Sequence, residues 1–201
     1  NIVVEKASVS TLEPTERVNL CTDTYIIKTD LLIDLLRKRQ SAGIVGSIES
    51  LLRDTIGPNT IAYEYTGYLN NIYDIKSYYD ANMDLLDCDC DFDLSDRNFR
   101  VFSNNTSRHP QFIGPQAKIS NSLICDGCII FGKVENSILS HDVVIHKKTS
   151  LKNVIVHTGA IIEDGAILEN CIVGARARIK GDARYITDPD DTTPEIHVIN
   201  N

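Results

Sequence analysis

The sequence predicts a mainly β chain built around a parallel β-solenoid over residues 113–181, and three observations support this prediction. Four similar segments recur at offsets of 15, 17 and 17 residues, and each begins with an asparagine: Asn121, Asn136, Asn153 and Asn170. An aliphatic residue returns every five or six positions from Leu139 to Ile179. A small or short side chain stands two positions before each of them. A short fixed period is typical of solenoids, in which stacked coils share one core.

Each three-residue block also predicts where its side chains point, because strand side chains alternate between two faces. The first and third residues face inward, where a small residue beside a large one fills a narrow coil. Coils stack at ~4.8 Å, so Ile145, Ile162 and Ile179 should lie one above another. Each asparagine should occupy a corner with positive φ, which asparagine tolerates. The alternative is an ordinary β-sandwich, which would not keep three columns in register.

The middle residue of each block faces outward, and these residues define three faces of the predicted solenoid. One face is wholly aliphatic and carries Leu123, Ile138, Ile155 and Ile172. The second carries Ile129, Val144, Ile161 and Arg178, and the third carries Lys118, Lys133, Ser150 and Ile167. A contiguous aliphatic patch indicates a contact surface. We therefore expect the first face to be an interface, covered by residues 1–112 or by another subunit.

Composition and charge narrow the classes of function. The chain has 201 residues, of which 42% are hydrophobic and 24% charged, as in a globular protein of one or two domains. Its net charge of −8 argues against a nucleic-acid-binding surface. No apolar run approaches the ~18 residues of a membrane span, and no signal-peptide pattern is present. We expect a cytoplasmic protein, and the initial Asn1 suggests a processed chain or a fragment.

Six cysteines raise the question of a metal site. Cys88 and Cys90 form one close pair, and Cys125 and Cys128 form another, so four thiolates are present for zinc. However, Cys128 and Cys171 fall in the inward column of small residues, where they fill the core. The sequence therefore predicts reduced thiols and no metal.

The residues before the solenoid predict an incomplete α+β domain over residues 1–86. The expected extended segments are residues 1–5, 19–28 (with Tyr25–Ile27 as a buried strand) and Ile61–Tyr65. The expected helices are Leu31–Gln40, a second one capped by Ser47, and Ile75–Leu86 capped by Asp74. Residues 87–112 read as a linker. Residues 182–201 read as a capping tail that ends in a closing strand at Ile196–Ile199.

The stretch Tyr78–Leu86, with Ala81-Asn82-Met83-Asp84 at its centre, resembles the end of the catalytic domain of bacterial ADP-glucose pyrophosphorylase (glucose-1-phosphate adenylyltransferase). Lys133–Leu139 resembles the opening of the C-terminal β-helix of that family. Together the likeness covers most of residues 18–180. It implies a left-handed parallel β-helix of hexapeptide repeats, preceded by an α+β remnant of a nucleotidyltransferase domain.

Departures from the family pattern bear on catalysis. Active members carry Tyr-Trp-x-Asp-Val-Gly-Thr-Ile before this helix, and its Asp helps to hold the catalytic Mg²⁺. Here Asn71 replaces that metal-binding Asp, and Tyr73 replaces the Gly. An amide is a poorer Mg²⁺ ligand than a carboxylate, and the reaction depends on positioning and on Mg²⁺. The Gly-rich nucleotide loop of the family is also absent from this sequence. The resemblance therefore implies no catalytic residue and no cofactor in this chain.

The resemblance further implies the C-terminal part of a regulatory, non-catalytic subunit. Its partner would be a catalytic subunit, in a cytoplasmic hetero-oligomer that makes ADP-glucose for glycogen. One alternative is a diverged catalytic subunit that still turns over. The other is a hexapeptide-repeat acyltransferase, in which a corner histidine among His141, His146 and His157 would act as the general base.

Basic residues in this acidic chain are candidates for binding a phosphorylated effector. Family effectors are phosphorylated sugars or phosphate, and arginine suits phosphate. The candidates are Arg97, Arg100, Arg108, Arg176, Arg178, Lys180 and Arg184. The alternative for the last four is a solvated surface that balances Glu163, Asp164 and Glu169.

Overall fold

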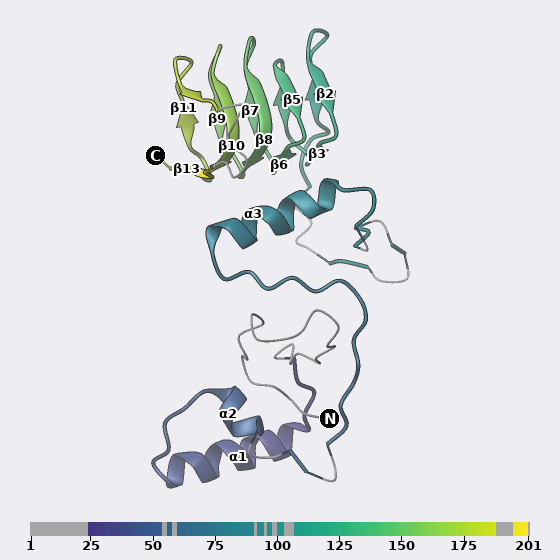
Figure 1. Ribbon diagram of the computed structural model, residues 1–201, viewed down its shortest axis with the longest axis vertical. Helices are drawn as coiled ribbons and strands as arrows, with labels where there is room; N and C mark the ends of the chain where they lie inside the picture. The colour runs from purple at the N-terminus through teal and green to yellow at the C-terminus, as the bar shows by residue number, and fades with distance from the viewer. Residues whose placement is uncertain are drawn as a thin grey trace, which may run out of the picture. The chain divides into compact units, whose positions relative to one another are not determined.

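The computed structural model describes residues 24–53, 56–57, 60–90, 92–94, 96–97, 100–102, 107–187 and 195–200. The chain divides into two compact units, residues 1–64 and residues 65–201, and Figure 1 shows the elements of each. The extended segments predicted at residues 1–5 and 19–23, and Cys21, lie outside the described residues.

Two helices make up the regular structure described in the first unit. α1 spans Thr29–Ser41 and α2 spans Ile48–Arg53. The Ser47 hydroxyl accepts a hydrogen bond from the N–H of Ser50 at 3.3 Å, as expected of the predicted cap. The Arg39 guanidinium on α1 donates to the Ser47 carbonyl and to the Ser50 hydroxyl. The start of α2 is thereby tied to the last turns of α1.

Two predicted strands before the solenoid fall on described residues, and both predictions are wrong. Tyr25–Ile27 and Ile61–Tyr65 form no strand, and Ile26 and Ile61 are 102% and 91% exposed. A strand needs a neighbour to satisfy its backbone groups, and no described segment pairs with either stretch. An apolar run predicts a buried strand only where such a neighbour exists.

The second unit begins with α3, which spans Ile75–Met83 and continues as the short 3₁₀ helix η2, Asp84–Leu86. The solenoid strands follow. They are β1 Phe112–Ile113, β2 Lys118–Ser120, β3 Leu123–Ile124, β4 Ile129–Ile130, β5 Lys133–Glu135, β6 Ile138–Leu139, β7 Val144–Ile145, β8 Ser150–Val156, β9 Ile161–Ile162, β10 Ile167–Val173, β11 Arg178–Ile179 and β12 Arg184–Tyr185. β13, His197–Ile199, closes the last coil by pairing with β10, which confirms the predicted closing strand.

Every strand pair is parallel, and Ile145 pairs with Ile162, which pairs in turn with Ile179. The predicted stacked column is therefore confirmed. The large aliphatic residues of the blocks from Ile130 to Val173 are fully buried, as are the small residues Cys128, Ser137, Ala160 and Ala166 beside them. This mainly β, parallel solenoid of hexapeptide repeats agrees with the predicted left-handed β-helix, and helices precede it as expected.

Three columns of outward residues run along the solenoid, and we name each face after its first strand. The β1 face carries Phe112, Ile129, Val144, Ile161 and Arg178. The β2 face carries Lys118, Lys133, Ser150, Ile167 and Arg184. The β3 face carries Leu123, Ile138, Ile155, Ile172 and Val198. The outer rungs Phe112, Arg184 and Val198 extend the faces predicted from the sequence.

One corner of the solenoid is a ladder of asparagines. Asn121, Asn136, Asn153 and Asn170 have φ between 41° and 55°, which confirms the predicted positive φ. Each side-chain amide donates to the next residue along the column, at 2.7 Å from Asn121 to Asn136, 2.8 Å to Asn153 and 3.0 Å to Asn170, and Asn170 donates to Thr187. The left-handed corners place the four asparagine side chains in line, so the NH₂ group of each one finds a hydrogen-bond acceptor on the next coil.

The predicted domains, 1–86, 87–112, 113–181 and 182–201, stay a prediction. The first unit ends at Glu64, and α3 belongs to the unit that holds the solenoid. The physical reason is that α3 packs on the solenoid: it runs across the side formed by β3, β6, β8 and β10 (Figure 1) and contacts β8.

Candidate functional site

The candidate site is the segment Tyr65–Leu86 where it meets the β3 face. Asp74 starts α3 with a reciprocal cap, because its carboxylate accepts from the N–H of Ser77 at 2.7 Å and the Ser77 hydroxyl accepts from the N–H of Asp74 at 3.0 Å. This hydrogen bond from the Ser77 backbone holds the pKa of Asp74 below its usual value. The cap predicted at Asp74 is confirmed.

Two tyrosines of α3 bind the solenoid. The Tyr79 hydroxyl donates to the backbone carbonyl of Asn153 at 2.8 Å. The Tyr78 ring stacks on His157 with ring centroids 6.0 Å apart, and its hydroxyl lies 3.3 Å from Nε2 of that histidine. Burial raises the pKa of Tyr79, so this hydroxyl stays protonated and remains a donor. The periodicity of the sequence does not predict these contacts, and the adjacent pair Tyr78 and Tyr79 is the only local signal for them.

The predicted interface residues of the β3 face differ in how far they are buried. Ile155 and Ile172 are 1% and 6% exposed, whereas Leu123 and Ile138 are half-buried. At ~25 cal/mol per Å² of apolar surface, covering side chains of this kind contributes several kcal/mol. An interface with another subunit stays a prediction.

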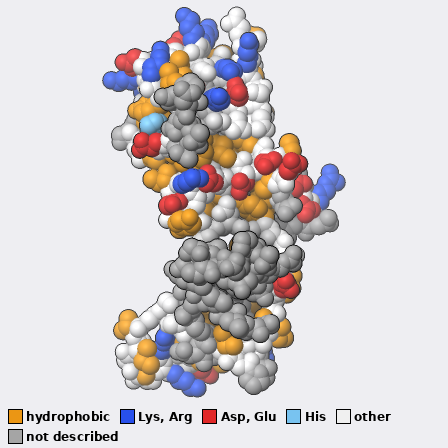
Figure 2. All heavy atoms as spheres, in the orientation of Figure 1, with side chains coloured by type: hydrophobic (Ala, Val, Ile, Leu, Met, Phe, Trp, Pro, Cys, Tyr) orange, Lys and Arg blue, Asp and Glu red, His pale blue; other side chains and the backbone are white. Residues whose placement is uncertain are grey.

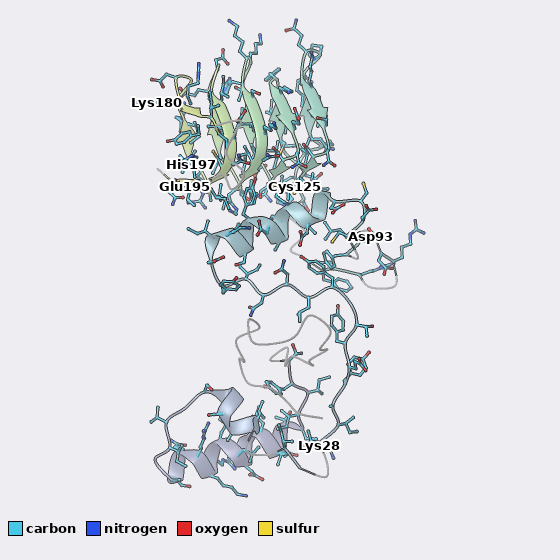
Figure 3. The ribbon with its side chains drawn as sticks, viewed as in Figure 1. Lys28, Asp93, Cys125, Lys180, Glu195 and His197 are labelled. Atoms are coloured by element: carbon cyan, nitrogen blue, oxygen red, sulfur yellow. The ribbon has the colours of Figure 1, made fainter. Side chains whose placement is uncertain are left out.

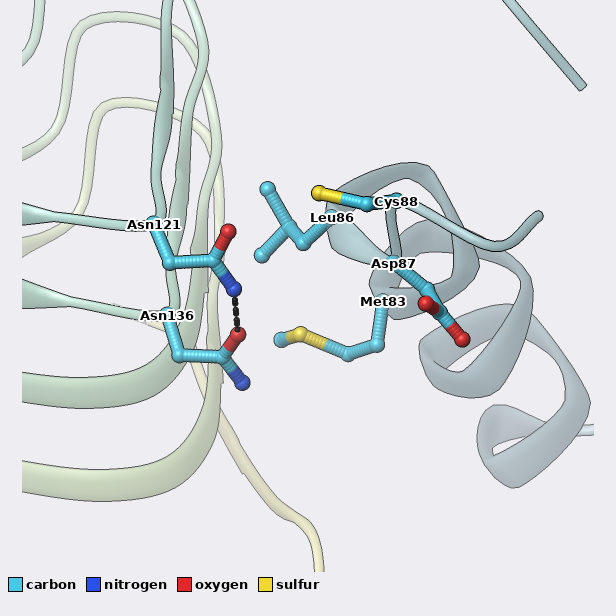
Figure 4. A pocket seen from close by; sticks show the side chains of 6 residues that line it. All are labelled: Met83, Leu86, Asp87, Cys88, Asn121 and Asn136. Carbon is cyan, nitrogen blue, oxygen red and sulfur yellow. Dashed lines mark hydrogen bonds between the residues drawn. The ribbon is translucent and has the colours of Figure 1, made fainter.

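Open pockets flank both ends of α3. One of about 420 Å³ lies where η2 meets the asparagine ladder, and it is lined by Met83, Leu86, Asp87, Cys88, Asn121 and Asn136. Figure 4 shows Leu86 and Met83 pointing toward the hydrogen-bonded pair Asn121 and Asn136. The other pocket, of about 460 Å³, lies between the start of α3 and the last coils, and its lining is mostly apolar: Ile72, Tyr73, Asp74, Ile75, Tyr78, Ile172 and Val198.

Asn71 lies in the extended stretch before α3, and its side chain is exposed. Tyr73 is 80% exposed, and its backbone N–H donates to the Ser77 hydroxyl. The nearby Asp84 carboxylate accepts from the Tyr68 hydroxyl at 2.9 Å, and burial, reinforced by this carboxylate, raises the pKa of Tyr68. Within the described part of the chain, no cluster of three or more His, Cys, Asp or Glu residues has an arrangement that would hold a metal ion.

The candidate effector residues have different partners, and Arg178 and Arg184 lie on different strands of the last coil. Arg176, Arg178, Lys180 and Arg184 follow the last coil around different sides, and Figure 3 places Lys180 at an edge of the solenoid remote from α3. Arg178 pairs with Glu163 at 3.0 Å, and Arg184 donates to the carbonyls of Gly165, Gly181 and Ala183. Arg108 pairs with Asp142. Arg97 and Arg100 are exposed.

The corner histidines have different surroundings. His157 is held by Tyr78, whereas His146 lies 3.6 Å from Asp164. Nδ1 of His141 is buried and lacks a hydrogen-bond partner. His141 and His146 lie on one coil and His157 lies on the next, and the structure gives none of them the hydrogen-bonded carboxylate that would orient a general base.

Comparison with known proteins found one matching family model and a set of similar proteins that share one name. A family described as GlmU-like, C-terminal hexapeptide, matches residues 110–200. Proteins named glucose-1-phosphate adenylyltransferase from Bacillus mycoides, Bacillus cereus and Bacillus anthracis are each 34% identical to this chain over 155 residues. These matches cover 77% of this chain and 41% of each relative. The chain thus spans less than half the length of the relatives it matches.

Among the helices that the structure describes, none has the length and apolar character that crossing a bilayer requires.

Proposed function

Because the chain belongs to the glucose-1-phosphate adenylyltransferase family and corresponds to its C-terminal portion, we propose that it is part of a regulatory, non-catalytic subunit of ADP-glucose pyrophosphorylase. The enzyme as a whole would convert glucose-1-phosphate and ATP to ADP-glucose and diphosphate. This subunit would assemble with a catalytic subunit in the cytoplasm and change the substrate or effector response of that partner.

The observation that carries the proposal is the chemistry around Asn71. The family resemblance assigns a Mg²⁺-binding carboxylate to this position, and the neutral amide supplies a weaker ligand. The nearby Asp74 does not replace it, because its carboxylate is engaged in the cap of α3. Tyr73 adds a bulky ring where the family pattern has glycine. The neutral Asn71 amide does not favour neutralisation of phosphate charge by Mg²⁺, and the Tyr73 ring does not favour close approach of a sugar nucleotide.

In this proposal the solenoid holds the helix that follows the Asn71 stretch. α3 is attached to the solenoid through the contact of Tyr78 with His157 and the hydrogen bond from Tyr79 to the Asn153 carbonyl, and it contacts β8, the strand that carries Ile155. The stretch that carries Asn71 directly precedes α3. A ligand or partner that binds the solenoid would thereby act on the segment that corresponds to the substrate site in the family. Phosphate or a phosphorylated sugar remains the proposed effector class, with Arg97, Arg100, Arg176, Arg178 and Lys180 as its candidate ligands.

The experiment compares the protein alone, a catalytic relative such as the Bacillus cereus enzyme alone, and the two together. We expect ADP-glucose formation only when the catalytic relative is present, with an altered apparent affinity for glucose-1-phosphate or for effector in the mixture. Turnover by the protein alone, further raised by Asn71→Asp, would instead support the diverged catalytic subunit. Turnover of acetyl-coenzyme A would support the acyltransferase.

A further inference from the structure

The asparagine ladder has a direction. Each side-chain amide donates toward the last coil, from Asn121 through Asn136 and Asn153 to Asn170, which donates to the Thr187 hydroxyl oxygen. Amide dipoles that align head to tail add together, as they do along a helix, and hydrogen bonds in a chain polarise one another. The Oδ1 atom of Asn121 is therefore the partially negative end of the ladder.

This oxygen is also an open acceptor. The Oδ1 atoms of Asn136, Asn153 and Asn170 each accept a hydrogen bond from the preceding rung. Asn121 is exposed, and among the residues that the structure describes no donor bonds to its Oδ1 atom. An acceptor at the negative end of an aligned column favours a positively charged donor, because charge-assisted hydrogen bonds are stronger than neutral ones.

The pocket of about 420 Å³ between η2 and the ladder is lined by Asn121. Leu86 and Met83 point toward the first rungs of the ladder (Figure 4). Leu86 is only 8% exposed, so packing holds this apolar wall in place. Asp87 is the only charged residue in the lining. The pocket thus combines an apolar wall with an open acceptor and a negative charge.

We propose that this pocket binds a primary alkylammonium group. An ammonium has three donors and no acceptor, so it suits a pocket that offers an acceptor and a carboxylate. It would donate to Oδ1 of Asn121 and be attracted by Asp87, while its methylene groups pack on Met83 and Leu86. The volume is at the small end of the range for small-molecule sites, which suits a short alkyl chain.

Other ligand classes fit this pocket less well. An anion would meet the Asp87 carboxylate and the negative end of the ladder, and like charges repel. A neutral alcohol could donate to Asn121 but would gain no attraction between charges. The basic residues proposed for a phosphorylated effector do not line this pocket, and the proposal does not depend on the proposed function.

Titration with 1-butylamine at pH 7, where it is the butylammonium ion, tests the proposal. 1-Butanol and butyrate are the neutral and anionic comparisons, at constant ionic strength. We expect butylammonium alone to give saturable shifts in the NMR signals of the Asn121 and Asn136 side-chain amides. Asp87→Asn should raise the dissociation constant about threefold or more, as expected for an exposed charge pair. Asp89→Asn is the matched control and should change it less, because Asp89 lies in the same turn but outside the lining.

Removing the acceptor gives an independent check. Asn121→Gly keeps the positive φ of 41° accessible but removes Oδ1, so it should raise the dissociation constant about tenfold. Circular dichroism melts establish that each variant is folded. In the unaltered protein, butylammonium should also slow the alkylation of Cys88 by iodoacetamide, measured by mass spectrometry, because this exposed thiol lines the pocket.

Nα-acetyl-lysine N-methylamide carries the same butylammonium group on a peptide unit and distinguishes two sources of the ligand. Tighter binding of this compound than of butylammonium would assign the pocket to a lysine of a protein segment, and equal or weaker binding would assign it to a small amine. Either result supports the proposal. Equal shifts with 1-butanol, binding of butyrate, no saturable shift with butylammonium, or affinities that both Asp87→Asn and Asn121→Gly leave unchanged would overturn it.

Discussion

The hydroxyl of Tyr79 donates a 2.8 Å hydrogen bond to the backbone carbonyl of Asn153, a residue 74 positions away at the corner of the solenoid. Through this bond the helix preceding the solenoid is fixed to the same corner that carries the asparagine ladder. The ladder and the helix therefore support each other, and changes in one should be detectable in the other.

Removing the Tyr79 hydroxyl should weaken the attachment of α3. Tyr79→Phe keeps the ring but leaves the Asn153 carbonyl without this donor, so we expect a loss of about 1 kcal/mol in the free energy of unfolding. Denaturant unfolding measures it. Tyr73→Phe is the control, because Tyr73 is 80% exposed and its hydroxyl should contribute nothing measurable. Equal effects of both substitutions would contradict this assignment.

The corner at Asn136 combines a backbone requirement with a side-chain requirement, and two substitutions separate them. Asn136→Gly keeps the positive φ of 46° accessible but removes the amide that bridges Asn121 and Asn153. Asn136→Ala removes the amide and also strains the backbone, at an added cost of about 1 kcal/mol or more. Thermal melts should rank the stability as Asn136, then glycine, then alanine. An alanine variant as stable as the glycine variant would show that the corner carries no strain.

A charge beneath α3 should release the helix without unfolding the solenoid. Ile155 is 1% exposed under α3, and burying an unpaired carboxylate there costs several kcal/mol. In Ile155→Glu we expect fast hydrogen exchange along α3. Protection should be retained in solenoid strands on other sides of the coil, such as β9. Ile167→Glu on the β2 face is the control. If α3 stays protected in Ile155→Glu, the docking account is wrong. Ile138→Glu should act in the same direction but less strongly, because Ile138 is only half-buried.

The buried thiols predict a fall in stability at alkaline pH. Burial raises the pKa of Cys171 from 9.0 to about 12, and it also raises the pKa of Cys128. Above pH 9 the unfolded chain loses these protons while the folded chain keeps them, so the free energy of unfolding decreases as pH rises from about 9 toward 12. Cys171→Ala should make this decline shallower, because it removes one of the two buried thiols, and alanine already fills other small inward positions such as Ala160.

Thiol labelling gives an independent check on the same residues. At pH 8 the exposed Cys88 should react with a thiol reagent in the native state, whereas Cys128 and Cys171 should react only after unfolding. Mass spectrometry of the labelled peptides distinguishes the sites. Rapid labelling of Cys171 in the folded protein would contradict the buried column.

The solenoid could be predicted closely because its determinants are local and repeated. The period placed Ile145, Ile162 and Ile179 in one column, and the asparagines marked the corners with positive φ. The helix at Ile75 was recognisable from the Asp74 cap, although it tightens into the 3₁₀ turn η2 after Met83.

What the sequence did not reveal depends on contacts distant along the chain. Tyr78 meets His157 across 79 positions, and no periodicity signals such a pair. The apolar runs at Tyr25–Ile27 and Ile61–Tyr65 resemble strands, but a strand forms only with a neighbour, which the described residues do not supply. The basic candidates read as a cluster in sequence, yet the turning coil distributes them over different sides.

The most direct test of the central claim is to measure ADP-glucose formation by the purified protein with glucose-1-phosphate, ATP and Mg²⁺, first alone and then with a catalytic relative. The account predicts no product from the protein alone and a changed glucose-1-phosphate or effector response in the mixture. Sustained turnover by the protein alone would contradict it.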